Sequence, residues 1–367
     1  MKTSALLFSA LSSLALAAPR PQHGHDAKPA APSETKVEDI KAEFSSQYKR
    51  SRVTYGTYKL SAFNAPAAHG GMSMPGMENE GGMTDASNKK APKPCSDCTL
   101  KYARASLHYP DGTIANFKTG AYLHHLTMAV VGPGRNDVAC PGGTMRIPKN
   151  MERMLAIHND RNETYFGINA NDKMGFYLGK DDTMDLELML KNEVNIPKEV
   201  IFTIEWEYAP GRPEGWSDVK GIWMDAAPCN AMDSDIPPPK NQTQFTLTGP
   251  EWVSPMDGKL LNTVGHMHDG GVDVKILVNG KPVCTSNAEY GSRPEYIASP
   301  EAIAQGASKS SHISRYTPCI AIGDIKKGDK LKLTADYDFV KWKPSLNKIG
   351  AQSHVMGVAM LFVEVKK

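Results

Sequence analysis

Short apolar or alternating runs separated by turn residues dominate the chain from Thr99 onward. Gly, Pro, Asn and Asp gather between the runs, as in Pro110-Asp111-Gly112 and Asn279-Gly280. Such runs predict half-buried strands, and no convincing amphipathic helix interrupts them. The pattern therefore predicts an all-β fold of the sandwich or barrel class. The expected strands cover residues 120–131, 184–190, 200–208, 244–248, 272–278, 330–337 and 355–365.

The length of this β-rich region predicts two domains. The roughly 270 residues that follow Cys95 are too many for one sandwich. A proline run at residues 236–240 lies midway, and proline-rich segments act as stiff spacers. We therefore predict two antiparallel, jelly-roll-like β-sandwich domains in tandem, residues 95–236 and 241–367.

The N-terminal part has a different composition. Residues 1–17 combine Lys2, an apolar run and closing small residues, a pattern typical of a secretory signal peptide. Residues 18–94 are rich in Pro, Ala, Ser, Gly and Lys, which predicts a disordered, Met/Gly/Pro-rich segment. A kexin-type protease could cut after the dibasic pair Lys49-Arg50, so the segment up to residue 50 is a possible propeptide.

These features predict a secreted, extracellular protein. No later apolar run has the length of a membrane span. The sequons at Asn162 and Asn241 are expected on the surface, where they would be glycosylated in a secreted protein. With 42 Lys and Arg against 40 Asp and Glu, the chain has no basic stripe, so nucleic acid is not an expected partner.

The six cysteines form an even set, which predicts disulfides in an oxidising compartment. The sequence alone leaves every pairing open. Cys95 and Cys98 have the spacing of half a zinc site, but the chain contains no second pair with that spacing. Disulfide bonding is therefore favoured over zinc.

Two histidine motifs stand out, His124-His125 and His266-Met267-His268. Residues two apart on a strand face the same side, so His266 and His268 can offer two imidazoles to one ion. Adjacent histidines face opposite sides, so His124 and His125 can share a metal only where their strand ends or bulges. Either motif alone is more often structural. One in each predicted domain favours metal binding.

Met356 opens the last expected strand, in His354-Val355-Met356-Gly357. A thioether beside two imidazoles favours copper over zinc or iron, because sulfur stabilises Cu(I) and nitrogen accommodates Cu(II). Methionine is also a common filler of apolar cores, and this alternative stays open.

The order of these motifs resembles that of the type II copper monooxygenases, the peptidylglycine and dopamine hydroxylases. A closer resemblance is to the stress up-regulated nodulin-type proteins, over roughly residues 102–365. It rests on residues 265–271, the Asn279-Gly280 turn, Cys284-Thr285-Ser286 and Val355-Met356-Gly357.

The resemblance implies two copper sites. His124 and His125 would hold the electron-donating copper. His266, His268 and Met356 would form the catalytic site at which oxygen is activated. The first site of the family has a third histidine on a later strand, and the matching strand here carries Met189, which we predict as the third ligand. His158 and His108 are rivals for that position.

The implied activity is C–H hydroxylation with O₂ and an external reductant such as ascorbate, using one or two copper ions. The family's substrate-binding arginine is Val264 here, and its tyrosine after the methionine ligand is Met360. Hydroxylation of peptide C-termini is therefore not expected, and the small-molecule or peptide substrate stays unknown.

The sequence leaves other functions open beside hydroxylation. A non-catalytic copper-scavenging protein is the main alternative, because His69 and the methionines between residues 72 and 83 could collect Cu(I). A structural protein with vestigial histidines is weaker. Glu205, Glu207 and Asp225 could suggest glycoside hydrolysis, but acidic residues on strands are usually solvated.

The two-domain division also leads to a pairing of the cysteines. We predict Cys284–Cys319 within the second domain and Cys140–Cys229 within the first. Cys95–Cys98 then follows by elimination.

Overall fold

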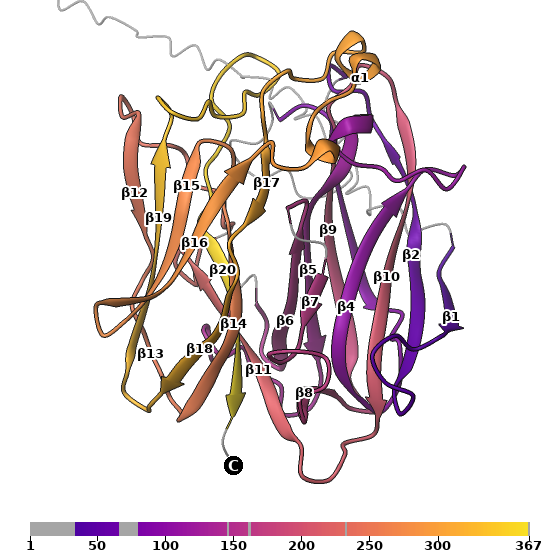
Figure 1. Ribbon diagram of the computed structural model, residues 1–367, viewed down its shortest axis with the longest axis vertical. Helices are drawn as coiled ribbons and strands as arrows, with labels where there is room; N and C mark the ends of the chain where they lie inside the picture. Colours follow the sequence, from indigo (N-terminus) through magenta and orange to yellow (C-terminus); the bar gives the residue numbers. More distant parts are fainter. Residues whose placement is uncertain (1–33, 66–79, 145–146, 161–162, 232, 366–367) are drawn as a thin grey trace, which may run out of the picture.

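The computed structural model describes residues 34–65, 80–144, 147–160, 163–231 and 233–365, and nearly all of its regular structure is β (Figure 1). Two sandwiches of mostly antiparallel strands lie side by side, which confirms the predicted fold class. The helical elements are one turn of α-helix, α1 (Pro300–Ala304), and the 3₁₀ turns η1 (Phe117–Thr119) and η2 (Pro294–Tyr296). Within the described ranges, no helix has the length and apolarity required to cross a membrane.

The first sandwich packs two sheets, ordered β1-β2-β10-β4-β8 and β3-β9-β5-β6, with β7 added to β4. Alternate residues of both sheets point inward, and Tyr55, Leu126 and Trp206 are fully buried in the core between them. The first sheet comprises β1 (Lys36–Ile40), β2 (Lys49–Leu60), β10 (Lys198–Pro210), β4 (Cys98–His108), β8 (Met174–Leu178) and β7 (Glu163–Tyr165). The second comprises β3 (Met83–Ala91), β9 (Thr183–Asn192), β5 (Ala121–Val131) and β6 (Met151–His158).

The second sandwich packs the strands β11-β20-β14-β18 against the sheet β12-β19-β15-β16-β17, with β13 added to β19. Its separate core contains Leu333, Leu361 and Val363. Its strands are β11 (Ser217–Asp225), β12 (Gln244–Thr248), β13 (Trp252–Val253), β14 (Gly258–His266), β15 (Gly271–Val278), β16 (Lys281–Tyr290), β17 (Ile313–Tyr316), β18 (Cys319–Ile325), β19 (Lys330–Asp338) and β20 (Val358–Val365).

One layer is shared by the two sandwiches. β11, from the first predicted domain, pairs along its length with β20 and meets β8 in a short parallel pairing. Successive residues of β20 enter different cores: Phe362 packs in the first and Leu361 in the second. The division at residue 236 thus separates the two halves of the chain but not two independent sheets.

The interpretation of residues 18–94 as disordered is wrong for β1, β2 and β3. β2 pairs with both β1 and β10, and its Val53 and Tyr55 are fully buried. The twelve-residue β2 carries a strand pattern that the polar flanking composition obscured. The proposed signal peptide, residues 18–33 and most of the methionine-rich segment lie outside the described residues.

The three predicted disulfides, Cys95–Cys98, Cys140–Cys229 and Cys284–Cys319, are all confirmed. Cys284 on β16 and Cys319 on β18 connect the two sheets of the second sandwich. Asn241 is exposed, as expected of a glycosylation site, and Asn162 lies outside the described residues.

The position of Arg50 gives a test of the propeptide hypothesis. Arg50 is 4% exposed within β2 and forms ion pairs with Glu205 (2.7 Å) and Glu207 (3.3 Å). A protease needs this strand to open before it can cut. We expect a kexin-type protease to leave the folded protein intact after Arg50 and to cut the denatured chain there, as measured by mass spectrometry of the digests. Equal cleavage of both forms would contradict this expectation.

Candidate metal centre

A β-bulge in β5 places two adjacent imidazoles together. In the pairing of β5 with β9, Leu123 lies opposite Leu190 and His125 opposite Met189, so His124 is the inserted residue. The rings of His124 and His125 have their centroids 4.0 Å apart. Of the two predicted possibilities, an end or a bulge of the strand, the structure has the bulge, which allows neighbouring histidines to act at one site.

The strands on either side of β5 supply further donor groups. On β9, the Met189 sulfur lies 3.4 Å from Nδ1 of His125. On β6, His158 lies opposite His125, and their ring centroids are 5.5 Å apart. Both Met189 and its rival His158 thus adjoin His125. The third candidate, His108, lies on β4 and contacts Thr203 Oγ1 through Nε2 at 3.1 Å.

The second sandwich contributes His266, the last residue of β14, and His268 in the turn that follows. This turn depends on Gly270, whose φ of +97° lies in a region that favours glycine. A Cβ atom on Gly270 would also lie 2.4 Å from the Phe339 ring. The turn geometry thereby determines where His268 can place its imidazole.

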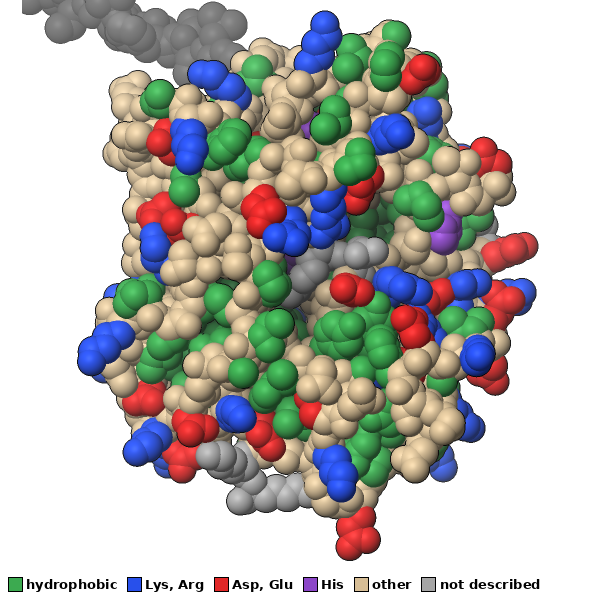
Figure 2. All heavy atoms as spheres, in the orientation of Figure 1, with side chains coloured by type: hydrophobic (Ala, Val, Ile, Leu, Met, Phe, Trp, Pro, Cys, Tyr) green, Lys and Arg blue, Asp and Glu red, His purple; other side chains and the backbone are tan. Residues whose placement is uncertain are grey.

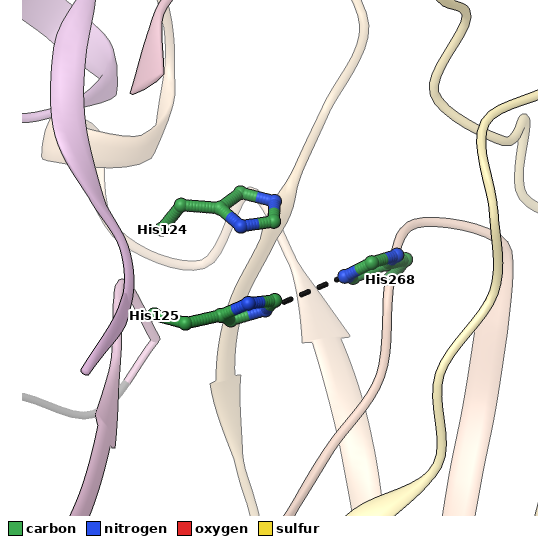
Figure 3. A group of neighbouring side chains, drawn as sticks. All are labelled: His124, His125 and His268. Atoms are coloured by element: carbon green, nitrogen blue, oxygen red, sulfur yellow. Dashed lines mark hydrogen bonds between the residues drawn. The ribbon is translucent and has the colours of Figure 1, made fainter. Parts of the chain in front are cut away.

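The two histidine motifs converge. His125 Nε2 lies 3.0 Å from His266 Nε2 and 3.4 Å from His268 Nε2. Figure 3 shows His124 and His125 projecting from β5 toward His268 on the opposite segment. The resemblance assigns the motifs to two separate coppers, whereas the structure brings them into contact across the two sandwiches.

In His125, His266 and His268, the second ring nitrogen, Nδ1, has a partner that orients the ring. Nδ1 of His266 contacts Asp160 Oδ1 at 3.0 Å, Nδ1 of His268 contacts the His354 carbonyl oxygen at 2.8 Å, and Nδ1 of His125 contacts the Met189 sulfur. These partners are acceptors, so each favours the proton on Nδ1 and leaves the Nε2 lone pair available. Three such lone pairs facing one another form a site suited to a cation.

Burial favours the neutral imidazole, which is the form that binds a metal ion. Loss of solvation holds the pKa of His124 and of His125 well below the usual range, with neighbouring histidines adding to the effect. Burial also lowers the pKa of His268. His124 Nδ1 is itself buried without a hydrogen-bond partner among the described residues.

The spacing also fits a first-row metal ion. Imidazole nitrogens at about 2.0–2.1 Å from one ion lie roughly 2.9–3.4 Å apart for right-angled to tetrahedral geometry. The two measured separations between Nε2 atoms fall in this range. In the described chain, ligand atoms gather within 4.8 Å of one another in two neighbouring groups, His124–His125–His268 and His158–Asp160–His266.

Met356 lies in the segment that contacts His268 but has a different environment. It is 5% exposed and packs in the core of the first sandwich, while its backbone N–H donates to the Tyr337 hydroxyl. Among the described residues, its sulfur forms no hydrogen bond with an imidazole nitrogen. Its role as a ligand therefore stays a prediction.

A polar cavity adjoins the histidine cluster, and its walls include Tyr122, His312 and Asp269 as well as His124, His266 and His268. His312 Nδ1 lies 2.6 Å from Asp269 Oδ2, and Ser345 donates to the same oxygen at 2.9 Å. Sequence reasoning missed His312 and Asp160, because each is separated from the two histidine motifs by many residues of chain.

The hydrolase alternative finds no support at Glu205 and Glu207. Glu205 pairs with Arg50, Arg52 and Arg104, and these arginines lower its pKa to about 2 although burial alone would raise it. Glu207 also pairs with Arg50. The Glu205 carboxylate is thus held as an ion, whereas a general acid needs a raised pKa.

Curated proteins with similar sequences exist. The chain is 26% identical over 319 residues to the "Probable copper-dependent oxygenase M1" of Phoma sp., a match that covers 87% of this chain and 73% of that protein. It is 28% identical over 259 residues to the "Probable copper-dependent oxygenase clz3" of Cochliobolus lunatus, covering 71% of this chain and 77% of that one. No protein-family model matches the chain.

Similarity to solved structures is weak. PNGase F, a glycosylasparaginase from Flavobacterium meningosepticum, is 8% identical with a TM-score of 0.36, over 91% of this chain and 96% of that one. A likeness this low supports no conclusion about fold or activity. The class defined so far is a two-sandwich protein with a buried histidine cluster, similar in sequence to proteins named as copper-dependent oxygenases.

The His312–Asp269 pair predicts a pH dependence of stability. Burial lowers the pKa of His312, but the carboxylates of Asp269 and Glu193 outweigh it and raise that pKa to about 9. The folded protein then binds a proton that the unfolded chain releases above about pH 6.5. The stabilisation is fully present below that pH and is lost as the pH rises toward 9.

We expect His312→Gln to destabilise the protein most at pH 6 and progressively less up to pH 9. Urea unfolding of both proteins at several pH values measures the difference. A stability difference that stays constant with pH would contradict the raised pKa.

Proposed function

We propose that this protein is a copper-dependent oxygenase that inserts one oxygen atom of O₂ into a C–H bond, with electrons from an external reductant such as ascorbate. The observation that carries the proposal is the contact of His125 with His266 and His268. The names of the two curated relatives support the same chemistry.

His124, His125 and His268 are the residues we assign to copper. Their ligand atoms lie within 4.8 Å of one another, and an all-imidazole set accommodates copper in both oxidation states. When bound, copper supplies the one-electron and O₂ chemistry. The chain supplies the rest: Met189 and the His354 carbonyl orient two of the rings, and burial limits the access of water to them.

We further infer kinship with the type II copper monooxygenases and the nodulin-type proteins, and secretion of the chain. The shared order of histidine motifs supports the kinship. The apolar N-terminal run and the three disulfides support an oxidising extracellular location. A substrate would enter the cavity lined by Tyr122 and His312, next to the assigned copper ligands.

Oxygen consumption tests the activity. We expect the copper-loaded protein with ascorbate to consume O₂ faster than the same concentration of free copper. His268→Ala should lose more than about 90% of this rate. Mutating a residue that only hydrogen-bonds a metal ligand typically lowers metal affinity or activity at least about tenfold, and removing a ligand itself should cost more. His108→Ala is the matched control, since His108 is a histidine outside the cluster.

The same experiment distinguishes the scavenging alternative. Tight copper binding by the wild-type protein with oxygen uptake no faster than that of free copper, across a broad substrate panel, would favour a non-catalytic copper protein. Equal loss of uptake in His108→Ala and His268→Ala would also contradict the assigned ligands.

Met189→Leu tests the thioether near His125. Leucine keeps the apolar volume but removes the sulfur, a soft donor that stabilises Cu(I). We expect the variant to bind Cu(I) more weakly and Cu(II) about equally, as measured by competition with chelators selective for each oxidation state. Equal weakening of Cu(I) and Cu(II) binding would show that Met189 acts only by orienting His125, and unchanged affinity for both ions would restrict it to packing.

A further inference from the structure

A second group of metal-binding side chains lies beside the copper ligands assigned above. His158, Asp160 and His266 have their ligand atoms within 4.8 Å of one another, and all three residues are buried. The rings of His158 and His266 are stacked, with centroids 3.9 Å apart and planes 6° from parallel. They come from different sandwiches, because His158 ends β6 and His266 ends β14.

Asp160 is the informative member of this group. Its side chain is 2% exposed, and its one ion pair among the described residues is the 3.0 Å contact of Oδ1 with His266 Nδ1. Its other oxygen, Oδ2, is buried and accepts no hydrogen bond from any described residue. Buried carboxylates are costly unless they are paired with a cation or coordinate a metal.

Nearby hydroxyl groups do not satisfy this carboxylate. Tyr296 and Tyr316 are close enough to Asp160 for its charge to help raise the pKa of both phenols, after the larger effect of burial. Their hydroxyls donate instead to backbone carbonyls, that of Tyr296 to Asn159 and that of Tyr316 to Met267. These two hydroxyls therefore leave Oδ2 of Asp160 without a donor among the described residues.

We propose that His158, Asp160 and His266 hold a second, divalent first-row metal ion next to the copper of the proposed function, on which this inference rests. Two imidazoles and a carboxylate form a harder donor set than three imidazoles. This set should retain Cu(II) or Zn(II) and hold Cu(I) poorly. The two neighbouring positions therefore differ in the oxidation state that they stabilise.

His266 connects the two positions. Its Nε2 faces His125 Nε2 at 3.0 Å, and its Nδ1 faces Asp160 at 3.0 Å. With only the first position filled, the Nδ1 proton stays on the ring and is donated to Asp160. If the second position were also filled, His266 Nδ1 would serve that ion and would give up the proton that it shares with Asp160.

Metal counting tests the proposal. The full-length mature protein is loaded with Cu(II) without reductant, desalted, and its copper counted by elemental mass spectrometry. We expect two ions per wild-type chain, one in Asp160→Asn, one in His124→Gln and two in the control His108→Gln. Reducing the wild-type protein with ascorbate in the presence of Zn(II) should then give one copper and one zinc per chain.

Three results would overturn the second site. The first is one copper per chain in both the wild-type protein and Asp160→Asn, a result that leaves the proposed function standing. Loss of all copper in a folded Asp160→Asn protein would show that Asp160 only orients His266. Retention of two ions by folded Asp160→Asn would exclude its carboxylate as a ligand.

Circular dichroism checks the fold of each variant. If Asp160→Asn does not fold, His158→Gln carries the same expectation of one ion. Two bound coppers without oxygen uptake above that of free copper would instead contradict the proposed activity and leave the second site intact.

Discussion

The contact of His125 with His266 and His268 is the interaction on which the account of this protein depends. It joins a strand of the first sandwich to the end of a strand and the following turn in the second, at nitrogen separations of 3.0 and 3.4 Å. Such a contact needs the sandwiches to be held in one arrangement. The shared layer of β11 and β20 provides this constraint, because β20 places Phe362 in one core and Leu361 in the other.

The surroundings of the cluster determine what it can bind. Acceptors on the outer nitrogens direct the Nε2 lone pairs inward, and burial keeps the rings neutral. At the cavity wall, His312 pairs with Asp269 and Lys191 pairs with Glu80. Charge is not gathered on the visible surface either, where acidic and basic side chains are interspersed (Figure 2).

Local patterns predicted much of this structure. Alternating runs predicted the all-β class. The adjacency of His124 and His125 predicted that a shared metal needs their strand to end or bulge there, since neighbouring strand residues otherwise face opposite sides. β2 was missed because its strand pattern lies within polar, proline-rich flanks. The convergence of the two histidine motifs, and the part played by Asp160, depend on contacts between residues more than 100 positions apart. No spacing along the chain encodes such contacts.

The central claim is that one copper ion is bound by imidazoles from both sandwiches. Anomalous diffraction at the copper absorption edge, from crystals of the copper-loaded protein, measures this most directly. We expect an anomalous peak within bonding distance of His124 or His125 on β5 and of His268 after β14. A peak bonded to histidines of one sandwich alone, or lying away from the cluster, would contradict it.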